Sequence, residues 1–306
     1  ELVAAAMLLA SRDIVGGIAF AQAQDPGMSA QDMNTLMEKE KKRFAGAELA
    51  GKTLGVVGLG SIGSLVAKLG LDLGMVVAGF DPALSVEAAW RLPSEVQRME
   101  NVQSLFSRSD FVSLHLPVLD STRGLVNEEM LNHFKTGSCL LNFAREEIVS
   151  TEAVVAALDN GQLRCYVADF PNPMLLGRTD TLLMPHIGAS TAEAEENCAI
   201  MSANQLKAFL EHGNIRNSVN FPAIELERTT DYRITIANRN EPGMLSHVLT
   251  LIGDEGLNVA DLLNKSFGDV AYNIIDLDEV PQEGLLNKIR TVEGVINLRL
   301  IEGTPG

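Results

Sequence analysis

The sequence has little of what marks membrane, secreted or metal-binding proteins. Three cysteines occur far apart and without CxxC spacing: Cys139, Cys165 and Cys198. This usage supports neither a disulfide framework nor a zinc site, so no metal is predicted, and it fits reduced core thiols in a cytoplasmic enzyme. No stretch approaches the ~20 apolar residues that span a bilayer. The apolar run 1–10 lacks a basic leader, and we expect a buried helix there.

Positive charge is scarce as well. The 306 residues contain 24 lysines and arginines against 40 acidic residues, a net charge of −16. Such a surface repels phosphate backbones and anionic lipids, which argues against nucleic acid and membrane partners. A chain of this length is too long for one ordinary core, and we therefore expect two domains.

Residues 1–222 are expected to form an α/β domain. Short apolar runs rich in β-branched residues alternate with helical patterns, which is typical of strands buried on both faces of a parallel sheet. The sequence predicts strands at 54–57, 75–80, 111–116, 138–142 and 165–169. This order indicates a doubly wound Rossmann sheet with flanking helices, the last of which stops at Gly213.

A different pattern follows a polar linker at 223–230. Between residues 231 and 306 the periodicity switches between period two and helical spacing. It predicts a strand near 232–236, a helix near 245–252, strands at 257–266 and 270–277, a helix at 285–289 and a strand at 295–301. The order βαββαβ indicates a ferredoxin-like domain.

Three glycines between the first predicted strand and its helix form a GxGxxG motif. Gly58 permits a tight turn, Gly60 lets the backbone approach a pyrophosphate, and Gly63 allows close packing of helix on strand. The amides near Ser61 and Ile62 then face the phosphates at the helix N-terminus. The position between strand and helix favours a dinucleotide site over glycines that serve plain turns.

Asp81 lies at the end of the second predicted strand. In dinucleotide-binding sequences a carboxylate about 20 residues after the glycine motif binds the ribose, and Asp81 is close to that spacing. An acid at this position repels a 2′-phosphate, so the sequence favours NAD over NADP as cofactor. The alternative interpretation is that Asp81 simply opens a turn before Pro82.

Four ordered motifs resemble those of the D-2-hydroxyacid dehydrogenases. They are GLGSIG at 58–63, HLP at 115–117, NFAREEIVS at 142–150 and PHIGAST at 185–191. Within that family, DFPN at 169–172 and EAEENCA at 193–199 are most similar to the short bacterial phosphoglycerate dehydrogenases. The tail at 231–303 is similar to their ACT regulatory domain.

The resemblance implies catalytic roles for Arg145 and His186. Oxidation of a hydroxy acid requires a base for the hydroxyl proton and a cation that holds the carboxylate. A histidine exchanges protons near neutral pH, and a guanidinium grips a carboxylate through two parallel hydrogen bonds. Taken alone, Arg145 could equally be a solvated charge and His186 a structural histidine.

The resemblance also implies a set of cofactor contacts. Asp169 is assigned to the nicotinamide carboxamide, and His115 to a loop beside the cofactor. With the glycine turn and Asp81, the implied set contains Pro82, His115, Pro117, Thr122, Phe143, Ala144, Arg145, Asp169, His186 and Gly188. Longer relatives carry an acid that pairs with the histidine, whereas this sequence has FPNP at 170–173, so the acidic partner of His186 is undetermined.

The resemblance begins partway into the family sequence, and the chain starts at Glu1 without a methionine. We therefore expect that a natural N-terminal segment, most of the substrate-binding lobe, is missing. A chain without that lobe is expected to bind the cofactor without measurable oxidation of 3-phosphoglycerate.

In the C-terminal domain, Asn238, Asn240 and Asn258 fall where ACT domains of phosphoglycerate dehydrogenases hold an amino-acid effector. Amide side chains offer donors and acceptors to a zwitterion, although asparagines are also ordinary turn residues. Serine is the effector that the resemblance suggests, but Asn238 stands where histidine is common in serine-inhibited relatives. A ferredoxin-like sheet leaves edge strands that need covering, which predicts a homo-oligomer.

The leading hypothesis is an NAD-dependent enzyme that interconverts 3-phosphoglycerate and 3-phosphohydroxypyruvate at the entry to serine biosynthesis. The choice of substrate rests on the resemblance. The alternatives are a dehydrogenase of another D-2-hydroxy acid and a non-catalytic protein that binds NAD or senses an amino acid.

Overall fold

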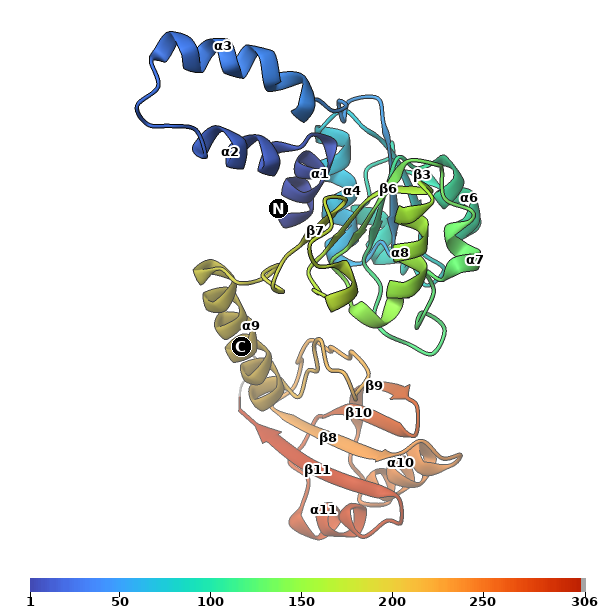
Figure 1. Ribbon diagram of the computed structural model, residues 1–306. Coiled ribbons are helices and arrows are strands. Elements are labelled where there is room, and N and C mark those ends of the chain that lie inside the picture. The colour runs from blue at the N-terminus through green and yellow to red at the C-terminus, as the bar shows by residue number, and fades with distance from the viewer. Residues whose placement is uncertain (304–306) are drawn as a thin grey trace. The chain divides into compact units, whose positions relative to one another are not determined.

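The computed structural model describes residues 1–303 (Figure 1). The chain divides into two compact units, Glu1–Ala189 and Ser190–Gly306. The first is an α/β unit built on a parallel sheet, and the second contains a separate antiparallel sheet.

The first unit is organised by a seven-stranded sheet in the order β3-β2-β1-β4-β5-β6-β7. Every pairing between its neighbouring strands is parallel. The five predicted strands are all present, and two short strands at the sheet edges were missed. The strands are β1 Thr53–Val57, β2 Val76–Phe80, β3 Gln97–Arg98, β4 Phe111–Leu114, β5 Ser138–Asn142, β6 Leu163–Ala168 and β7 Thr181–Leu183.

Helices cover both faces of this sheet (Figure 1). Alternate residues of each strand enter two different cores, because successive side chains of a strand point to opposite faces. Leu54 and Val56 pack with α1 (Leu2–Ser11) and with α4, the helix after β1, whereas Val112 and Leu114 pack with the later helices α6, α7 and α8. The elements between the strands are α4 Ser61–Asp72, α5 Val86–Arg91, α6 Val102–Arg108, α7 Glu128–Leu131, η2 Glu146–Ile148, α8 Thr151–Asp159 and η3 Pro173–Leu175.

Three helices precede the sheet: α1 Leu2–Ser11, α2 Ile14–Gln22 and α3 Ala30–Glu40, followed by the 3-10 helix η1 Lys41–Phe44. The predicted buried helix at the start is confirmed, since Ala6 and Met7 of α1 are fully buried. Neither α2 nor α3 has a buried residue. Within residues 1–303 no single helix has the length and apolarity to cross a membrane, and α1 and α2 meet that test only as a pair bent by 73°.

The second unit begins with α9 Ala192–His212, which ends at Gly213 as predicted because that glycine adopts the left-handed conformation, φ 71°. The following elements have the predicted order: β8 Tyr232–Arg239, α10 Met244–Asp254, β9 Val259–Phe267, β10 Val270–Leu277, α11 Glu283–Arg290 and β11 Val295–Glu302. The sheet is antiparallel, with the order β11-β8-β10-β9. These connections are those of a ferredoxin-like fold.

The two faces of the antiparallel sheet are covered differently. Ile234 and Ile236 face the core formed with α10 and α11. Ala237 and Tyr272 face a smaller core that includes Phe209 of α9 and residues of the segment 214–226. The unit therefore starts at Ser190 rather than at the predicted boundary after residue 222, because α9 and the segment after it pack on this sheet.

One cysteine differs from the expectation of core thiols. Cys139 and Cys165 are buried and lie directly opposite each other on β5 and β6. Cys198 instead lies on α9 and is exposed. The helix that carries it has a single buried residue, Ala208, so an apolar stretch of sequence here does not correspond to a core.

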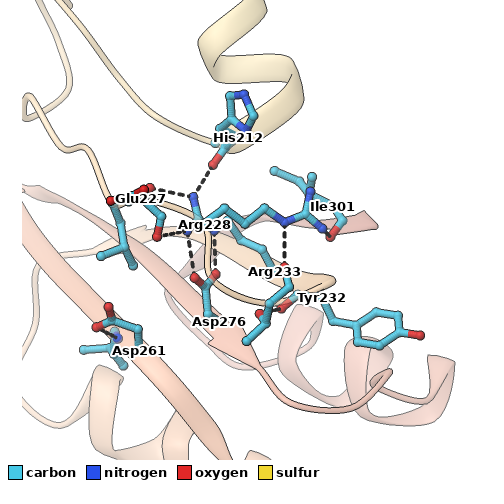
Figure 2. Close-up of polar contacts among 12 residues, drawn as sticks. His212, Glu227, Arg228, Tyr232, Arg233, Asp261, Asp276 and Ile301 are labelled. Carbon is cyan, nitrogen blue, oxygen red and sulfur yellow. Dashed lines mark hydrogen bonds and ion pairs between the residues drawn. The ribbon is translucent and has the colours of Figure 1, made fainter. Parts of the chain in front are cut away.

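A fully buried ion pair joins the parts of the second unit (Figure 2). The side chains of Arg233 and Asp276 are both 0% exposed, and two hydrogen bonds of 2.5 and 2.8 Å connect them. The remaining donors of Arg233 reach backbone oxygens of His212, Leu226 and Glu227. One guanidinium thus links the end of α9, the following segment and strand β10.

Breaking this pair is expected to destabilise the second unit strongly. Asp276→Asn leaves the arginine buried without a counter-charge, which costs about 3–5 kcal/mol. The measurement is hydrogen exchange of the β8 and β10 amides in the whole chain. The control is Glu255→Gln, which removes the exposed Lys288–Glu255 pair and should cost less than about 1 kcal/mol. Equal losses in both variants would contradict this assignment.

Candidate cofactor and active site

The predicted cofactor and catalytic residues lie at one edge of the parallel sheet. Because all seven strands run in the same direction, the loops after their carboxyl ends emerge on one side. The strand order changes direction between β1 and β4, since β2 lies on one side of β1 and β4 on the other. Ligands of doubly wound sheets bind in the crevice at such a switch point.

The glycine turn after β1 has the geometry that its three glycines predict. Gly58 is left-handed, φ 89°, and a Cβ on it would lie 2.4 Å from the carbonyl oxygen of His115. A Cβ on Gly63 would lie 1.8 Å from the carbonyl oxygen of Gly58. A larger residue at either position would therefore force strand, turn and helix apart.

Gly60, unlike Gly58 and Gly63, has open space around it. It is the N-cap of α4, and a Cβ on it would meet no atom within 4 Å. No side chain caps the helix, and Ser61 and Ile62 at its start are exposed. The first backbone N–H groups of α4 thus face open space, and the residues present fit a bound pyrophosphate.

Asp81 joins the glycine turn to the end of β2. Its carboxylate accepts hydrogen bonds from the backbone N–H groups of Leu59, at 2.8 Å, and Ala83, at 2.9 Å. Asp81 and Pro82 line a cavity of about 990 Å³ that continues past Trp90. This space extends from the turn toward β3 and fits the adenosine half of a dinucleotide.

The same cavity contains a residue that the sequence did not single out. Arg98, on the short edge strand β3, lines it together with Asp81. An arginine near the ribose can accommodate a 2′-phosphate, whereas the acid disfavours one. The cavity is thus lined by one acidic and one basic side chain that have opposite preferences for a 2′-phosphate.

The loop after β4 carries the HLP motif. The ring of His115 lies 2.8 Å from the hydroxyl of Ser113, and burial lowers the pKa of His115 to about 4. The hydroxyl of Thr122 donates to the carbonyl of Pro117 at 2.6 Å and accepts from the N–H of Leu119 at 2.8 Å. Pro117 and Thr122 thus close one loop, beside a histidine that is neutral at physiological pH.

The turn after β5 positions Arg145. The buried side chain of Asn142 accepts from the N–H of Ala144 and donates to the carbonyl of Arg145 at 2.9 Å. Phe143 is half-buried, Ala144 is buried and Arg145 is exposed. One nitrogen of the Arg145 guanidinium donates to the carbonyl of Ala144 at 2.7 Å. Asn142 was missed as a site residue, although it stands first in the motif NFAREEIVS.

The loop that carries His186 is fixed by Asp169. This aspartate follows β6, is 2% exposed, and accepts from the N–H groups of Ile187, at 3.0 Å, and Gly188, at 2.9 Å. His186 has a left-handed backbone, φ 55°, which is uncommon for a residue with a side chain. The Asp169 carboxylate binds the backbone of the two residues that follow His186 and so fixes the position of the imidazole.

His186 itself is exposed, and its ring lies against Phe170 with centroids 5.0 Å apart. Within residues 1–303 no carboxylate forms an ion pair with this histidine. Arg145, Asp169 and His186 follow the three neighbouring strands β5, β6 and β7. Among the residues that the structure describes, no cluster of His, Cys, Asp and Glu is arranged to hold a metal ion.

The three asparagines predicted to hold an effector are not brought together within one chain. Asn238 is buried and bonds to Asn273, and Asn240 bonds to the carbonyl of Gly268. Asn258 bonds to Asp278 near the other end of the sheet. Asn238 pairs with Ala271 and Val259 with Leu277, so about 20 Å of strand separates the two places. Strand register, which the sequence does not show, decides this separation.

Comparison with known proteins assigns the first unit. Residues 5–188 match the family model described as D-isomer specific 2-hydroxyacid dehydrogenase, NAD binding domain. The chain is 32% identical over 267 residues to D-3-phosphoglycerate dehydrogenase of Haemophilus influenzae and 31% identical over 268 residues to that of Escherichia coli K12. Each match covers 83% of this chain and 64% of the relative, so the chain spans less than two thirds of their length.

Solved structures give the same assignment. A D-2-hydroxyisocaproate dehydrogenase matches with a TM-score of 0.58 and 26% identity, covering 70% of this chain and 66% of that one. D-mandelate dehydrogenase of Rhodotorula graminis matches with a TM-score of 0.57 and 26% identity, covering 66% and 59%. The chain belongs to the D-isomer-specific 2-hydroxyacid dehydrogenase family, and its first unit is the NAD-binding domain of that family.

Proposed function

We propose that this protein takes part in the NAD-dependent interconversion of 3-phosphoglycerate and 3-phosphohydroxypyruvate, the entry to serine biosynthesis. The observation that carries the proposal is the match over 83% of the chain to enzymes named D-3-phosphoglycerate dehydrogenase. Arg145 and His186 are the residues assigned to the chemistry. They follow β5 and β7, the strands on either side of β6, at the edge that carries the glycine turn.

The cofactor half of the proposal rests on the glycine turn. The N–H groups at the start of α4 would hold the pyrophosphate, and Asp81 would accept hydrogen bonds from the adenosine ribose. Pro82, Pro117, Thr122, Phe143 and Ala144 are assigned to the walls of the same crevice. Bound NAD supplies the acceptor for the hydride that leaves C2 of the substrate.

The substrate half rests on two exposed side chains. The guanidinium of Arg145 would hold the substrate carboxylate through parallel hydrogen bonds and orient C2. The imidazole of His186 would accept the hydroxyl proton as the carbonyl forms, and return it in the reverse direction. We assign Asp169 a positioning role, because both of its oxygens already bind the backbone beside His186.

A second candidate is a dehydrogenase of a different D-2-hydroxy acid. It is favoured by the structural likeness to enzymes named for D-mandelate and D-2-hydroxyisocaproate. The two candidates share every residue named above and differ in what binds the rest of the substrate. A panel of D-2-hydroxy acids, assayed by NADH formation, separates them.

We assign a regulatory role to the ferredoxin-like part of the second unit, as an ACT-like domain. Asn238 and Asn240, beside the turn before α10, would contact an amino-acid effector such as serine, whereas Asn258 would contribute only from a second chain. Strands β9 and β11 are the edges of the sheet, and β9 is largely exposed. Pairing of such edges would produce a homo-oligomer.

The chain is expected to bind NADH more tightly than NADPH, because the Asp81 carboxylate would face the 2′-phosphate. Asp81→Ala should weaken NADH about tenfold or more, since a charged acceptor of the ribose hydroxyls is lost. Isothermal calorimetry of the 306-residue chain measures both affinities. Glu48→Ala, an exposed acid outside the cavity, is the control. Equal or tighter binding of NADPH by the unaltered chain would contradict the assignment.

Turnover is expected to depend on His186. In protein that oxidises 3-phosphoglycerate, His186→Ala should lower kcat by about 100-fold or more, because proton transfer is removed. The matched control is His133→Ala, which removes an exposed histidine outside the motifs. Arg145→Ala should lower kcat and raise KM for the hydroxy acid. Normal kcat in His186→Ala would exclude it as the acid and base.

The folded state should lose stability in acid through His115. Its folded pKa of about 4 lies below the ordinary value of 6.5, so the unfolded chain binds the proton more readily between these values. The contribution of His115 to the free energy of unfolding should therefore be fully present above pH 6.5 and should fall by about 3 kcal/mol toward pH 4. Urea unfolding followed by circular dichroism measures this slope. His115→Gln should flatten it, and an unchanged slope would refute the assignment.

A further inference from the structure

A further pocket lies on the outer face of the antiparallel sheet, which is the face opposite to α10 and α11. It lies within the second unit and has a volume of about 660 Å³. Its walls come from the C-terminal half of α9, the loop 214–221 and the strands β8, β10 and β11. Pockets that bind small molecules have volumes of roughly 300–1,000 Å³.

The hollow results from two features of the sheet. Ala237, in the central strand β8, offers only a methyl group to this face. Strand β11 slips in register between Val295 and Asn297, and the side chain of Ile296 at the slip is 60% exposed at the pocket. A small residue beside a bulge leaves space that larger, regularly spaced side chains would fill.

The aromatic walls are held in place by the protein itself. The rings of Phe221 and Tyr272 meet edge to face with centroids 6.1 Å apart, and the hydroxyl of Tyr272 donates to the carbonyl of Gly213. The guanidinium of Arg299 lies 4.6 Å from the ring centroid of Phe209 and donates to the carbonyl of that residue. The walls therefore require little ordering when a flat apolar group enters.

A positive side chain lines the pocket of a chain that is acidic as a whole. Among the described residues that line it, Arg216 carries a positive charge and none carries a carboxylate, although the whole chain has a net charge of −16. One nitrogen of Arg216 binds Glu225 at 2.5 Å. The other guanidinium donors have no partner in the described part of the chain, and the side chain is 48% exposed. They remain able to bind an anionic group.

We propose that this pocket binds a small aromatic monocarboxylate. The ring of the ligand would lie among Phe209, Phe221 and Tyr272, where edge-to-face and offset contacts are available. Its carboxylate would bind Arg216 at the rim, and the amide of Asn297 offers a further donor. This site goes beyond the proposed dehydrogenase function and is distinct from the turn assigned to an amino-acid effector.

The charge requirement is tested with two probes of nearly equal shape, 3-phenylpropionate and 3-phenylpropanamide, by ligand-observed NMR titration of the whole chain. We expect saturable binding, tighter for the acid. Arg216→Gln should weaken the acid about fivefold and leave the amide unchanged. Arg290→Gln, a surface arginine outside the pocket, should change neither. Absence of saturable binding, or equal affinity for both probes, overturns the proposal.

The location is tested by a matched pair on one helix. Leu206 and Leu210 of α9 are 60% and 59% exposed, but Leu206 lines the pocket and Leu210 does not. Leu206→Glu places a carboxylate beside the ligand and should abolish binding of 3-phenylpropionate, whereas Leu210→Glu should leave its affinity unchanged. Both substitutions are on the surface, so folding should be retained. Unaltered binding in Leu206→Glu, or equal loss in both variants, overturns the assignment to this pocket.

Discussion

Parallel pairing of seven strands brings the loops that follow them to a single edge of the first unit. The glycine turn, the HLP loop, the turn at Arg145 and the loop at His186 are far apart in sequence, yet each follows a strand of this sheet. Parallel strands also require helical crossovers, which bury both sheet faces and leave only the edges free. The parallel direction of the strands therefore determines where the proposed active site lies.

Two buried polar side chains hold the loops that carry exposed residues at this edge of the sheet. Asn142 and Asp169 are nearly inaccessible, and each binds the backbone of a loop that carries an exposed side chain proposed to be catalytic. Burial fixes their own rotamers, and losing their partners would leave unsatisfied polar groups in the interior. Arg145 and His186 can thus be open to a substrate while the backbone that carries them stays fixed.

The second unit is held together by a charge pair instead of a shared strand direction. Arg233 has its guanidinium satisfied by Asp276 and by three backbone carbonyls, which fixes the end of α9 and the following segment on the sheet. A buried guanidinium is tolerated only when its donors are satisfied. The same arrangement covers part of the outer sheet face and leaves the aromatic pocket between helix, loop and strands.

The sequence by itself determined the features that depend on neighbouring residues. The glycine turn, the five main strands, the helix stop at Gly213 and the order of the ferredoxin-like elements could all be predicted from local pattern and backbone preference. Motif resemblance added Arg145 and His186, for which the chemistry of the residues alone left other interpretations open.

Only the tertiary structure decided what depends on register and on distant partners. Strands β3 and β7 are too short to show a pattern, and they form because a neighbouring strand offers hydrogen bonds. Arg233 and Asp276 are 43 residues apart, and Asp169 lies 18 and 19 residues from the amides that it binds. Strand register likewise places Asn258 and Asn238 far apart along the sheet. Local periodicity specifies which face of an element is buried, but pairing between elements specifies which side chains meet.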